Sequence, residues 1–109
     1  MKNNTIYLDH ILKAIAAIET YTFDVSEDYF LNNRMIQDAV VRQFEIIGEA
    51  TKRLTAEFRT KHDNVSWADM AGMRDKLIHD YIDVDIWIVW KAVKEDIPEL
   101  KGQLQKFFN

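Results

Sequence analysis

The sequence predicts an all-α fold, an antiparallel up-and-down bundle of four long helices and one or two short ones. Apolar residues recur every three or four positions along most of the chain, which is the spacing of the buried face of a helix. Three glycines and one proline leave few of the turns that a β-sandwich or barrel needs. The 109 residues match the size of one domain, and no stretch reads as a linker, so we expect a single helical domain over residues 1–109.

Two helices are predicted in the first third of the chain. The first has Thr5 as its N-cap and is expected to end near residues 20–22. Its apolar face consists of Leu8, Ile11, Leu12, Ile15 and Ile18. A short second helix should begin at Ser26, because two acidic residues follow it and suit the positive end of a helix, and should run to about Asn32.

The third predicted helix is the longest and covers residues 34–59. Its apolar stripe consists of Ile36, Val40, Val41, Phe44, Ile47, Ala50, Thr51 and Leu54. A polar run at residues 61–64 is expected to form a loop. Ser66 and Asp69 then fit a capping box that opens a fourth helix, which should run to about Tyr81.

Two further helices are predicted near the C-terminus. Asp83 is the expected cap of the fifth helix, and Pro98 suits the first position of the last one, where a missing N–H costs nothing. The three tryptophans are expected in the core. Residues 86–90 (IWIVW) are apolar on every side of the helix, which favours an interface between two copies of the chain.

Composition excludes several classes of site. With no cysteine, the chain has no disulfide, no thiolate zinc site and no cysteine nucleophile. The start of the chain has no export signal and no stretch is apolar enough to span a membrane, so we expect a cytoplasmic location. A net charge of −4 argues against nucleic acid as a partner, but residues 34–61 carry six Lys or Arg against four Asp or Glu, a local charge of +2.

The side chains suited to catalysis are concentrated at positions 72–81. This short segment contains Arg74, Lys76, His79 and Tyr81. A histidine can take the proton of a ribose 2′-hydroxyl, or return one to a leaving 5′-oxygen, near neutral pH. An arginine can stabilise the charge that develops on phosphoryl oxygens. These are the side chains that metal-free cleavage of a phosphodiester requires. The other two histidines have no partner at ligand spacing, so a bound metal has little support.

A simpler interpretation is that Arg74 and His79 only stabilise the C-terminal end of a helix, where cations are favoured. Five positions also separate the two residues by roughly 140° around an ideal helix. Both can therefore belong to one site only if the helix is distorted or if a second subunit contributes. Tyr81, seven positions after Arg74, returns to the side of Arg74.

The pattern Arg-x-x-x-x-His-x-Tyr at Arg74, His79 and Tyr81 resembles the signature of the HEPN superfamily, and in particular the HepT toxins of the HepT–MntA toxin–antitoxin systems. Four blocks in the same order extend the resemblance over nearly the whole chain: YLDHILKAI, DAVVRQFEIIGEATKRL, WADMAGMRDKLIHDY and VDIWIVWKAVKEDIPELK. The short motif alone is weak, whereas four blocks in register are specific.

The resemblance implies a HEPN-like helical homodimer whose paired motifs line a cleft and cleave RNA without metal or cofactor. Arg74 and His79 would be the catalytic pair. Tyr81 matches the tyrosine that a partner nucleotidyltransferase, the MntA-like antitoxin, modifies with AMP to silence the toxin. Such a modification adds negative charge where an RNA phosphate should lie.

Supporting residues are also predicted. Glu45 or Glu49 is a candidate to orient Arg74, and Gly48 beside them should let another helix approach closely; an exposed salt-bridged face is the alternative for these glutamates. Lys76 is a candidate to hold the RNA backbone. The acidic neighbours at positions 75 and 80 oppose RNA binding, or instead serve recognition of the antitoxin.

A second function stays open at this stage. HEPN domains also act as non-catalytic accessory subunits that bind nucleotide or RNA for a partner nucleotidyltransferase, and the acidic net charge favours that role. The intact pair of Arg74 and His79 favours the enzyme.

Overall fold

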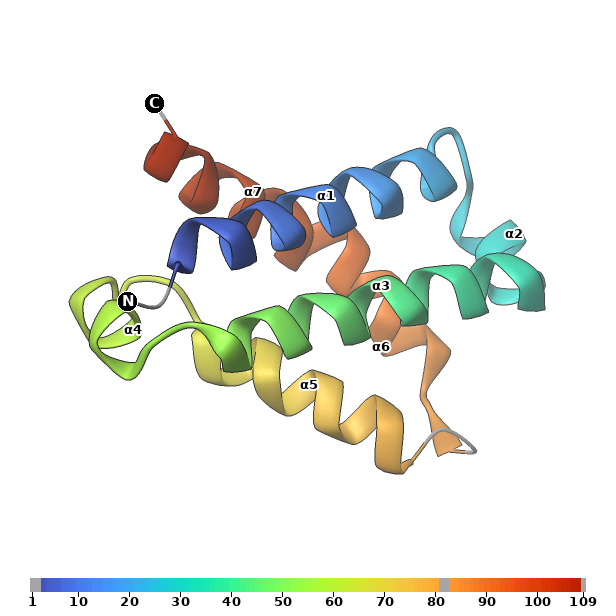
Figure 1. The fold of residues 1–109 in the computed structure, drawn as a ribbon. Helices are drawn as coiled ribbons and strands as arrows, with labels where there is room; N and C mark the ends of the chain where they lie inside the picture. The colour runs from blue at the N-terminus through green and yellow to red at the C-terminus, as the bar shows by residue number, and fades with distance from the viewer. Residues whose placement is uncertain (1–2, 81–82, 109) are drawn as a thin grey trace.

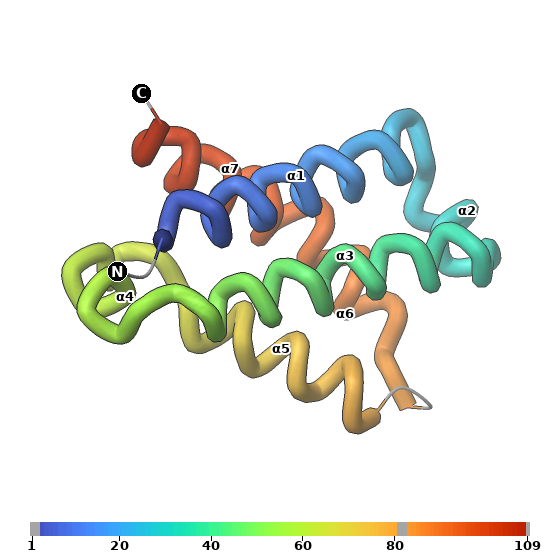
Figure 2. Tube along the Cα trace, viewed as in Figure 1, coloured from blue at the N-terminus to red at the C-terminus, as the bar shows by residue number. Residues whose placement is uncertain are grey.

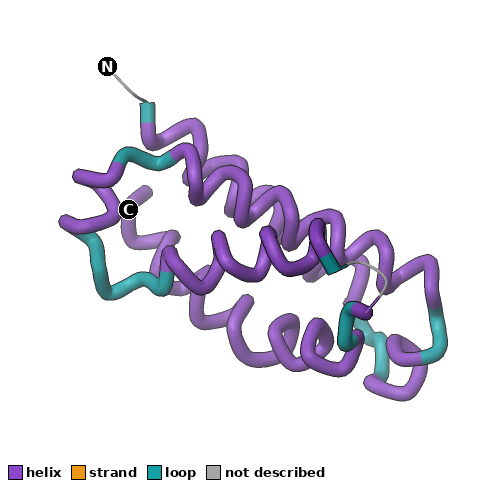
Figure 3. The backbone as a smooth tube through the Cα atoms, turned by 90° about the horizontal axis from the view of Figure 1, so that it is seen from below, coloured by secondary structure: helices purple, strands orange, loops and turns teal. Residues whose placement is uncertain are grey.

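A computed structural model describes residues 3–80 and 83–108, and every regular element in these ranges is helical (Figure 1), so the predicted all-α bundle is confirmed. The elements are α1 (Asn4–Thr22), α2 (Glu27–Leu31), α3 (Arg34–Arg53), α4 (Ala56–Lys61), α5 (Trp67–His79), α6 (Ile86–Lys91), the π-helical turn η2 (Ala92–Asp96), α7 (Ile97–Gln105) and the 3₁₀ turn η3 (Lys106–Phe108). Figure 3 shows the same path as helices joined by short connections.

Helix α3 lies at the centre of the molecule. It packs against α1 on one side and α5 on the other, and α1 and α3 run in opposite directions (Figure 1). Helix α7 packs against α1, and the short helix α2 packs against both α3 and α6. None of the described helices combines the length and the apolar character needed to cross a membrane.

The core forms where the predicted apolar faces of α1 and α3 meet. Ile11 and Ile18 of α1 and Val40 of α3 are 0% exposed, and Phe44 and Ile47 of α3 are also buried. Burying such side chains contributes about 1.5–3 kcal/mol each. Other buried apolar residues extend this core toward α2, α5, α6 and α7, among them Phe30, Leu54, Val65, Trp67, Leu77, Val89, Trp90, Val93, Ile97, Leu100 and Leu104.

The predicted N-cap of the first helix is wrong. Helix α1 begins at Asn4, so Thr5 lies inside its first turn and cannot cap it, and the cap residue Asn3 makes no side-chain cap bond. The side chain of Asn4 instead bonds to Thr55 in both directions: its Nδ2 donates to Thr55 Oγ1 (3.3 Å) and its Oδ1 accepts from the Thr55 N–H (3.0 Å). The start of α1 is therefore tied to the start of α4.

The predicted third helix, 34–59, is two helices in the structure. Helix α3 ends at Arg53, because Leu54 turns to extended backbone (φ −66°, ψ 146°) and buries its side chain. Thr55 then caps α4 by accepting a hydrogen bond from the Phe58 N–H at 3.1 Å. A break that places Leu54 in the core overrides the continuous helical periodicity of the sequence.

Two later caps also differ from the prediction. Ser66 precedes α5 as expected but makes no side-chain cap bond, since its ψ of 63° departs from the extended backbone that aims a capping hydroxyl. The cap of α6 is Asp85, which accepts from the Trp87 N–H at 3.0 Å, and not Asp83. The predicted end of the fourth helix at Tyr81 lies outside the described residues.

The last two predicted helices form one continuous run through η2 (Figure 2). Pro98 has no N–H to donate and would clash with a carbonyl one turn earlier in a regular helix. The chain widens to a π-turn just before it, where the Ile97 N–H bonds to the Ala92 carbonyl five residues back. Such a π-turn is a known way to pass an interruption without ending a helix.

Trp67 and Trp90 are buried as predicted, whereas Trp87 is not. Trp87 is 47% exposed and its neighbour Ile88 is 51% exposed. The two side chains lie on the outward side of α6, because the opposite side, with Val89 and Trp90, already faces the core. They form an exposed apolar surface, as expected for residues 86–90, which are apolar on every side of the helix.

Replacing Thr55 by Ala should lower the free energy of unfolding by about 1–2 kcal/mol, because the variant loses the cap of α4 and a partner of Asn4. Thr5→Ala, at the position that the sequence marks as a cap, should change it by less than about 0.5 kcal/mol. Urea unfolding followed by circular dichroism measures both. Equal losses in the two variants would contradict the assigned caps.

Candidate active site

Arg74 occupies the place where α3 and α5 approach most closely. A side-chain carbon added at Gly48 of α3 would overlap the Arg74 Cβ and lie 2.8 Å from both the Arg74 Cγ and the Met70 carbonyl oxygen. Glycine is therefore required at this position by the backbone of α5, as the sequence predicts for Gly48.

Two carboxylates hold the guanidinium of Arg74. Its Nη2 donates to Glu49 Oε1 at 2.8 Å, and its Nη1 donates to Asp75 Oδ1 at 2.9 Å. The hydrogen bond to Asp75, followed by the negative charge of Glu49, raises the pKa of Arg74 in spite of partial desolvation. The side chain is 24% exposed, so a charged and oriented cation lies at the surface between the two helices.

The two ion pairs of Arg74 belong to a longer series of ion pairs between α3 and α5. Asp75 Oδ1 also accepts from Lys52 Nζ at 2.7 Å, and Glu49 Oε2 accepts from Arg53 Nε at 3.3 Å. The hydrogen bonds from Lys52 and then Arg74 lower the pKa of Asp75. Alternating charges therefore run from Lys52 through Asp75, Arg74 and Glu49 to Arg53 and join α3 to α5.

Of the two glutamates predicted to orient Arg74, Glu49 contacts it. Glu45 lies one turn earlier on α3 and pairs with Arg42, with 3.5 Å between Glu45 Oε1 and Arg42 Nη1. Sequence reasoning did not find Lys52 and Arg53 as members of the cluster. The spacing of Glu49 and Arg53 is visible in the sequence as an i, i+4 pair, whereas the pairing of Lys52 with Asp75 exists only once α5 lies on α3.

His79 is the last residue of α5 and is exposed. Helix α5 is regular from Trp67 to His79, so five positions turn His79 away from the side of Arg74. No hydrogen bond or ion pair between His79 and Arg74 occurs within residues 3–80 and 83–108. Tyr81 lies outside the described residues.

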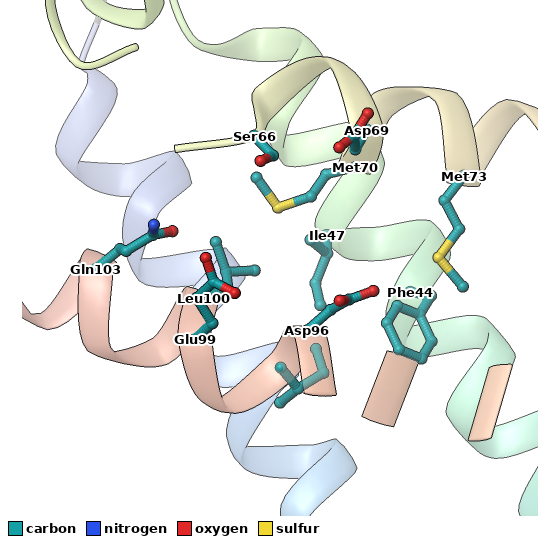
Figure 4. Close-up of a pocket in the computed structure, with 11 residues that line it drawn as sticks. Phe44, Ile47, Ser66, Asp69, Met70, Met73, Asp96, Glu99, Leu100 and Gln103 are labelled. Carbon is teal, nitrogen blue, oxygen red and sulfur yellow. The ribbon is translucent and has the colours of Figure 1, made fainter. Parts of the chain in front are cut away.

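Among the hollows formed by the described residues, three border α5. The smallest, the methionine pocket, has a volume of about 140 Å³ between α3, α5 and α7. Figure 4 shows its apolar side chains, among them Phe44, Met70 and Met73, together with the carboxylates of Asp69, Asp96 and Glu99. Partial burial, together with neighbouring acidic groups, raises the pKa of Asp96.

The second hollow, the acidic groove, has a volume of about 480 Å³ and separates α5 from α6 and η2. Its charged lining consists of Asp69, Lys76, Asp80, Asp83, Asp85, Lys91, Glu95 and Asp96. Lys76, predicted to hold RNA, therefore lies among carboxylates and not beside Arg74. No group of three or more His, Asp or Glu in the described part of the chain is arranged to hold a metal ion.

The third hollow, the basic groove, has a volume of about 260 Å³ and crosses α1, α3 and α5. Its charged and aromatic lining consists of Tyr7, His10, Arg42, Glu45, Glu49, Arg53 and Arg74. It contains Arg74 and both of the predicted supporting glutamates. The structure thus gathers Arg74, Glu45 and Glu49 in one groove and leaves His79 at the end of α5 and Lys76 in another.

Comparison with known proteins gives a consistent set of similarities. The family described as "Ribonuclease HepT-like" matches residues 11–107. A Thermococcus cleftensis protein named "Probable ribonuclease HepT" is 48% identical over 100 residues, which are 92% of this chain and 91% of that protein. A Methanocaldococcus jannaschii protein named "Gamma-glutamylcyclotransferase and putative RNase" is 50% identical over 105 residues, 96% of this chain. The chain spans 47% of that longer protein. No solved structure matches.

Gly48→Ala should lower the free energy of unfolding by about 1–3 kcal/mol, because the added methyl group forces α3 and α5 apart. Gly72→Ala is the matched control, since nothing lies within 4 Å of an added carbon there. That variant should gain up to about 1 kcal/mol from the higher helix propensity of alanine. If urea unfolding finds both variants equally stable, the close approach at Gly48 is not required.

Proposed function

Because the chain belongs to the HepT-like ribonuclease family, we propose that it is an endoribonuclease that cleaves RNA at Arg74 and His79, without a metal ion. The observation that supports this most directly is the state of Arg74. A cation held by Glu49 and Asp75 at the surface needs little reorganisation to stabilise a phosphoryl group, and such preorganised charge is the largest contribution in many enzymes.

In the proposed reaction, His79 accepts the proton of a ribose 2′-hydroxyl, and the 2′-oxygen forms a bond to the adjacent phosphorus. The bond from phosphorus to the 5′-oxygen of the next nucleotide breaks, and an imidazolium returns a proton to that oxygen. The products are a 2′,3′-cyclic phosphate and a 5′-hydroxyl end. Arg74 binds the non-bridging oxygens, whose negative charge increases in the transition state.

Arg74 retains donors for this task. Each Nη carries two N–H groups, and each directs one of them to a carboxylate. The Nε–H is buried and has no hydrogen-bond partner among the described residues, so it is not available to a phosphate. The second N–H on each Nη is therefore the group that binds the phosphoryl oxygens.

The active form in this proposal is a homodimer. A regular α5 directs Arg74 and His79 to different sides, so a second copy is needed to bring a histidine to an arginine. The exposed Trp87 and Ile88 provide apolar surface for the contact. A symmetric dimer would place two Arg74–His79 pairs in one cleft.

The proposal includes a toxin–antitoxin pair in the cytoplasm. A partner nucleotidyltransferase would transfer AMP from ATP to the hydroxyl oxygen of Tyr81, two positions after His79, with release of pyrophosphate. The added phosphate would repel the RNA backbone. The second candidate function is a non-catalytic accessory subunit of that partner. The acidic groove favours it over the ribonuclease, because its surplus of carboxylates repels an RNA substrate and leaves that face for a protein partner.

The decisive experiment is cleavage of labelled RNA by purified protein in EDTA. The unmodified wild type should cut the RNA, and His79→Ala should be slower by about 10²–10⁴-fold because it loses the general acid–base group. Mass spectrometry of the wild type must first show that Tyr81 carries no AMP. Equal activity of the two proteins would reject His79, and no cleavage by either would favour the accessory subunit.

Glu49→Gln should lower kcat by about 10- to 100-fold, because a misplaced Arg74 no longer meets the phosphoryl group. Glu45→Gln is the matched comparison on the same helix, and its kcat should stay close to that of the wild type, since Glu45 contacts Arg42 and not Arg74. Both variants should unfold at similar urea concentrations, because exposed ion pairs contribute only about 0–1 kcal/mol. Equal rates in the two variants would show that Glu49 does not position Arg74.

A further inference from the structure

The basic groove continues from Arg74 along α3, and the reaction proposed above does not use most of it. Arg42 and Arg53 lie at its two ends on α3, eleven positions apart, which corresponds to about 16 Å along a helix. Tyr7 and His10 of α1 form the facing wall. The groove is thus longer than the contact between Arg74 and a single phosphate.

Charge distinguishes this groove from the other two hollows. Its lining includes three arginines and two glutamates. The acidic groove has six carboxylates and two lysines, and the methionine pocket has three carboxylates and no lysine or arginine. A polyanion is therefore attracted to the basic groove and repelled from the others, although the whole chain has a net charge of −4.

The arginines of the groove have free surface for a ligand. The side chains of Arg42 and Arg53 are 68% and 59% exposed, although each pairs with a glutamate of its own helix. Hydrogen bonding of the Arg53 guanidinium to Tyr7, and then to the accepting carboxylate of Glu49, raises the pKa of Arg53. Such partly paired guanidinium groups keep outward N–H donors that phosphate oxygens can accept.

The wall on α1 has two aromatic rings. Tyr7 and His10 lie edge to face, with ring centroids 6.1 Å apart and an angle of 88° between the planes. His10 is exposed and Tyr7 is partly buried. Aromatic rings beside a basic track are the combination that binds single-stranded nucleic acid without strong sequence preference, because every base has a face that can stack.

We infer that the basic groove binds single-stranded RNA next to the cleavage site, with Arg42 on a backbone phosphate and Tyr7 and His10 against a base. This inference rests on the proposed function for its substrate class and adds the residues that hold the strand. It assigns RNA to the side of α5 that presents Arg74, and not to the side that presents Lys76.

Binding is tested with a fluorescein-labelled single-stranded oligonucleotide whose riboses are 2′-O-methylated, because it has no 2′-hydroxyl to react and is not cleaved. Arg42→Gln should weaken its binding several-fold and lower the slope of log K against log salt by about 0.7, the value for one phosphate contact on a single strand. Arg34→Gln is the matched control, since Arg34 also lies on α3, pairs within its own helix and is exposed, but does not line the groove.

The stacking wall is tested by Tyr7→Ala, which should weaken binding by about tenfold. Tyr7→Phe keeps the ring and should restore most of the affinity. Tyr21→Ala, at an exposed tyrosine of the same helix outside the groove, should have no effect. Thermal unfolding of each variant shows that the loss is not due to misfolding.

The two proposals fail in different ways. If binding of the oligonucleotide depends on Arg42 and Tyr7 while RNA is never cut, RNA binding by the basic groove is supported and the ribonuclease activity is rejected. If RNA is cut but oligonucleotide binding and KM are the same in wild type, Arg42→Gln and Tyr7→Ala, RNA binding by the basic groove is rejected and the ribonuclease activity is supported. A wild type that does not bind the oligonucleotide also rejects the groove.

Discussion

The close approach of α3 and α5 at Gly48 is the constraint on which the candidate site depends. Because Gly48 has no side chain, the Cβ and Cγ of Arg74 fill the space beside the α3 backbone. The guanidinium then extends along α3 and reaches Glu49, the residue that follows Gly48. A larger residue at position 48 would move α5 outward and separate Arg74 from the carboxylate that orients it.

The charges around Arg74 serve orientation more than stability. The ion pairs that link Lys52 to Arg53 through Asp75, Arg74 and Glu49 are all partly exposed. Exposed ion pairs contribute little to the free energy of unfolding. These ion pairs instead fix the direction of the Arg74 guanidinium and the charge state of the Asp75 carboxylate. The lowered pKa of Asp75 keeps its carboxylate ionised down to a pH below the ordinary aspartate range, so the contribution of its pairing is present above that range and is lost as the pH falls through the lowered pKa.

Helix α5 separates two surfaces of opposite charge. Arg74 faces the basic groove, whereas Lys76 and Asp80 face the acidic groove, because successive residues of a helix differ by about 100° in direction. A protein with a net negative charge can thus present a local basic surface. The acidic groove lies on the other side of α5, and the apolar side chains of Trp87 and Ile88 are exposed on α6.

The sequence by itself determined the helical class, the buried faces of α1 and α3 and the cap of α2 at Ser26, since helical periodicity and local capping depend on neighbours in the chain. It also indicated that another helix can approach at Gly48, but that this helix is α5 follows only from the contact with Arg74 and Met70. Only the tertiary structure decided that the third helix breaks at Leu54, that Asn4 bonds to Thr55, and that Glu49 and not Glu45 contacts Arg74. The contacts of Asn4 with Thr55 and of Glu49 with Arg74 join residues 51 and 25 positions apart, and neither periodicity nor spacing contains the distance at which two helices pack.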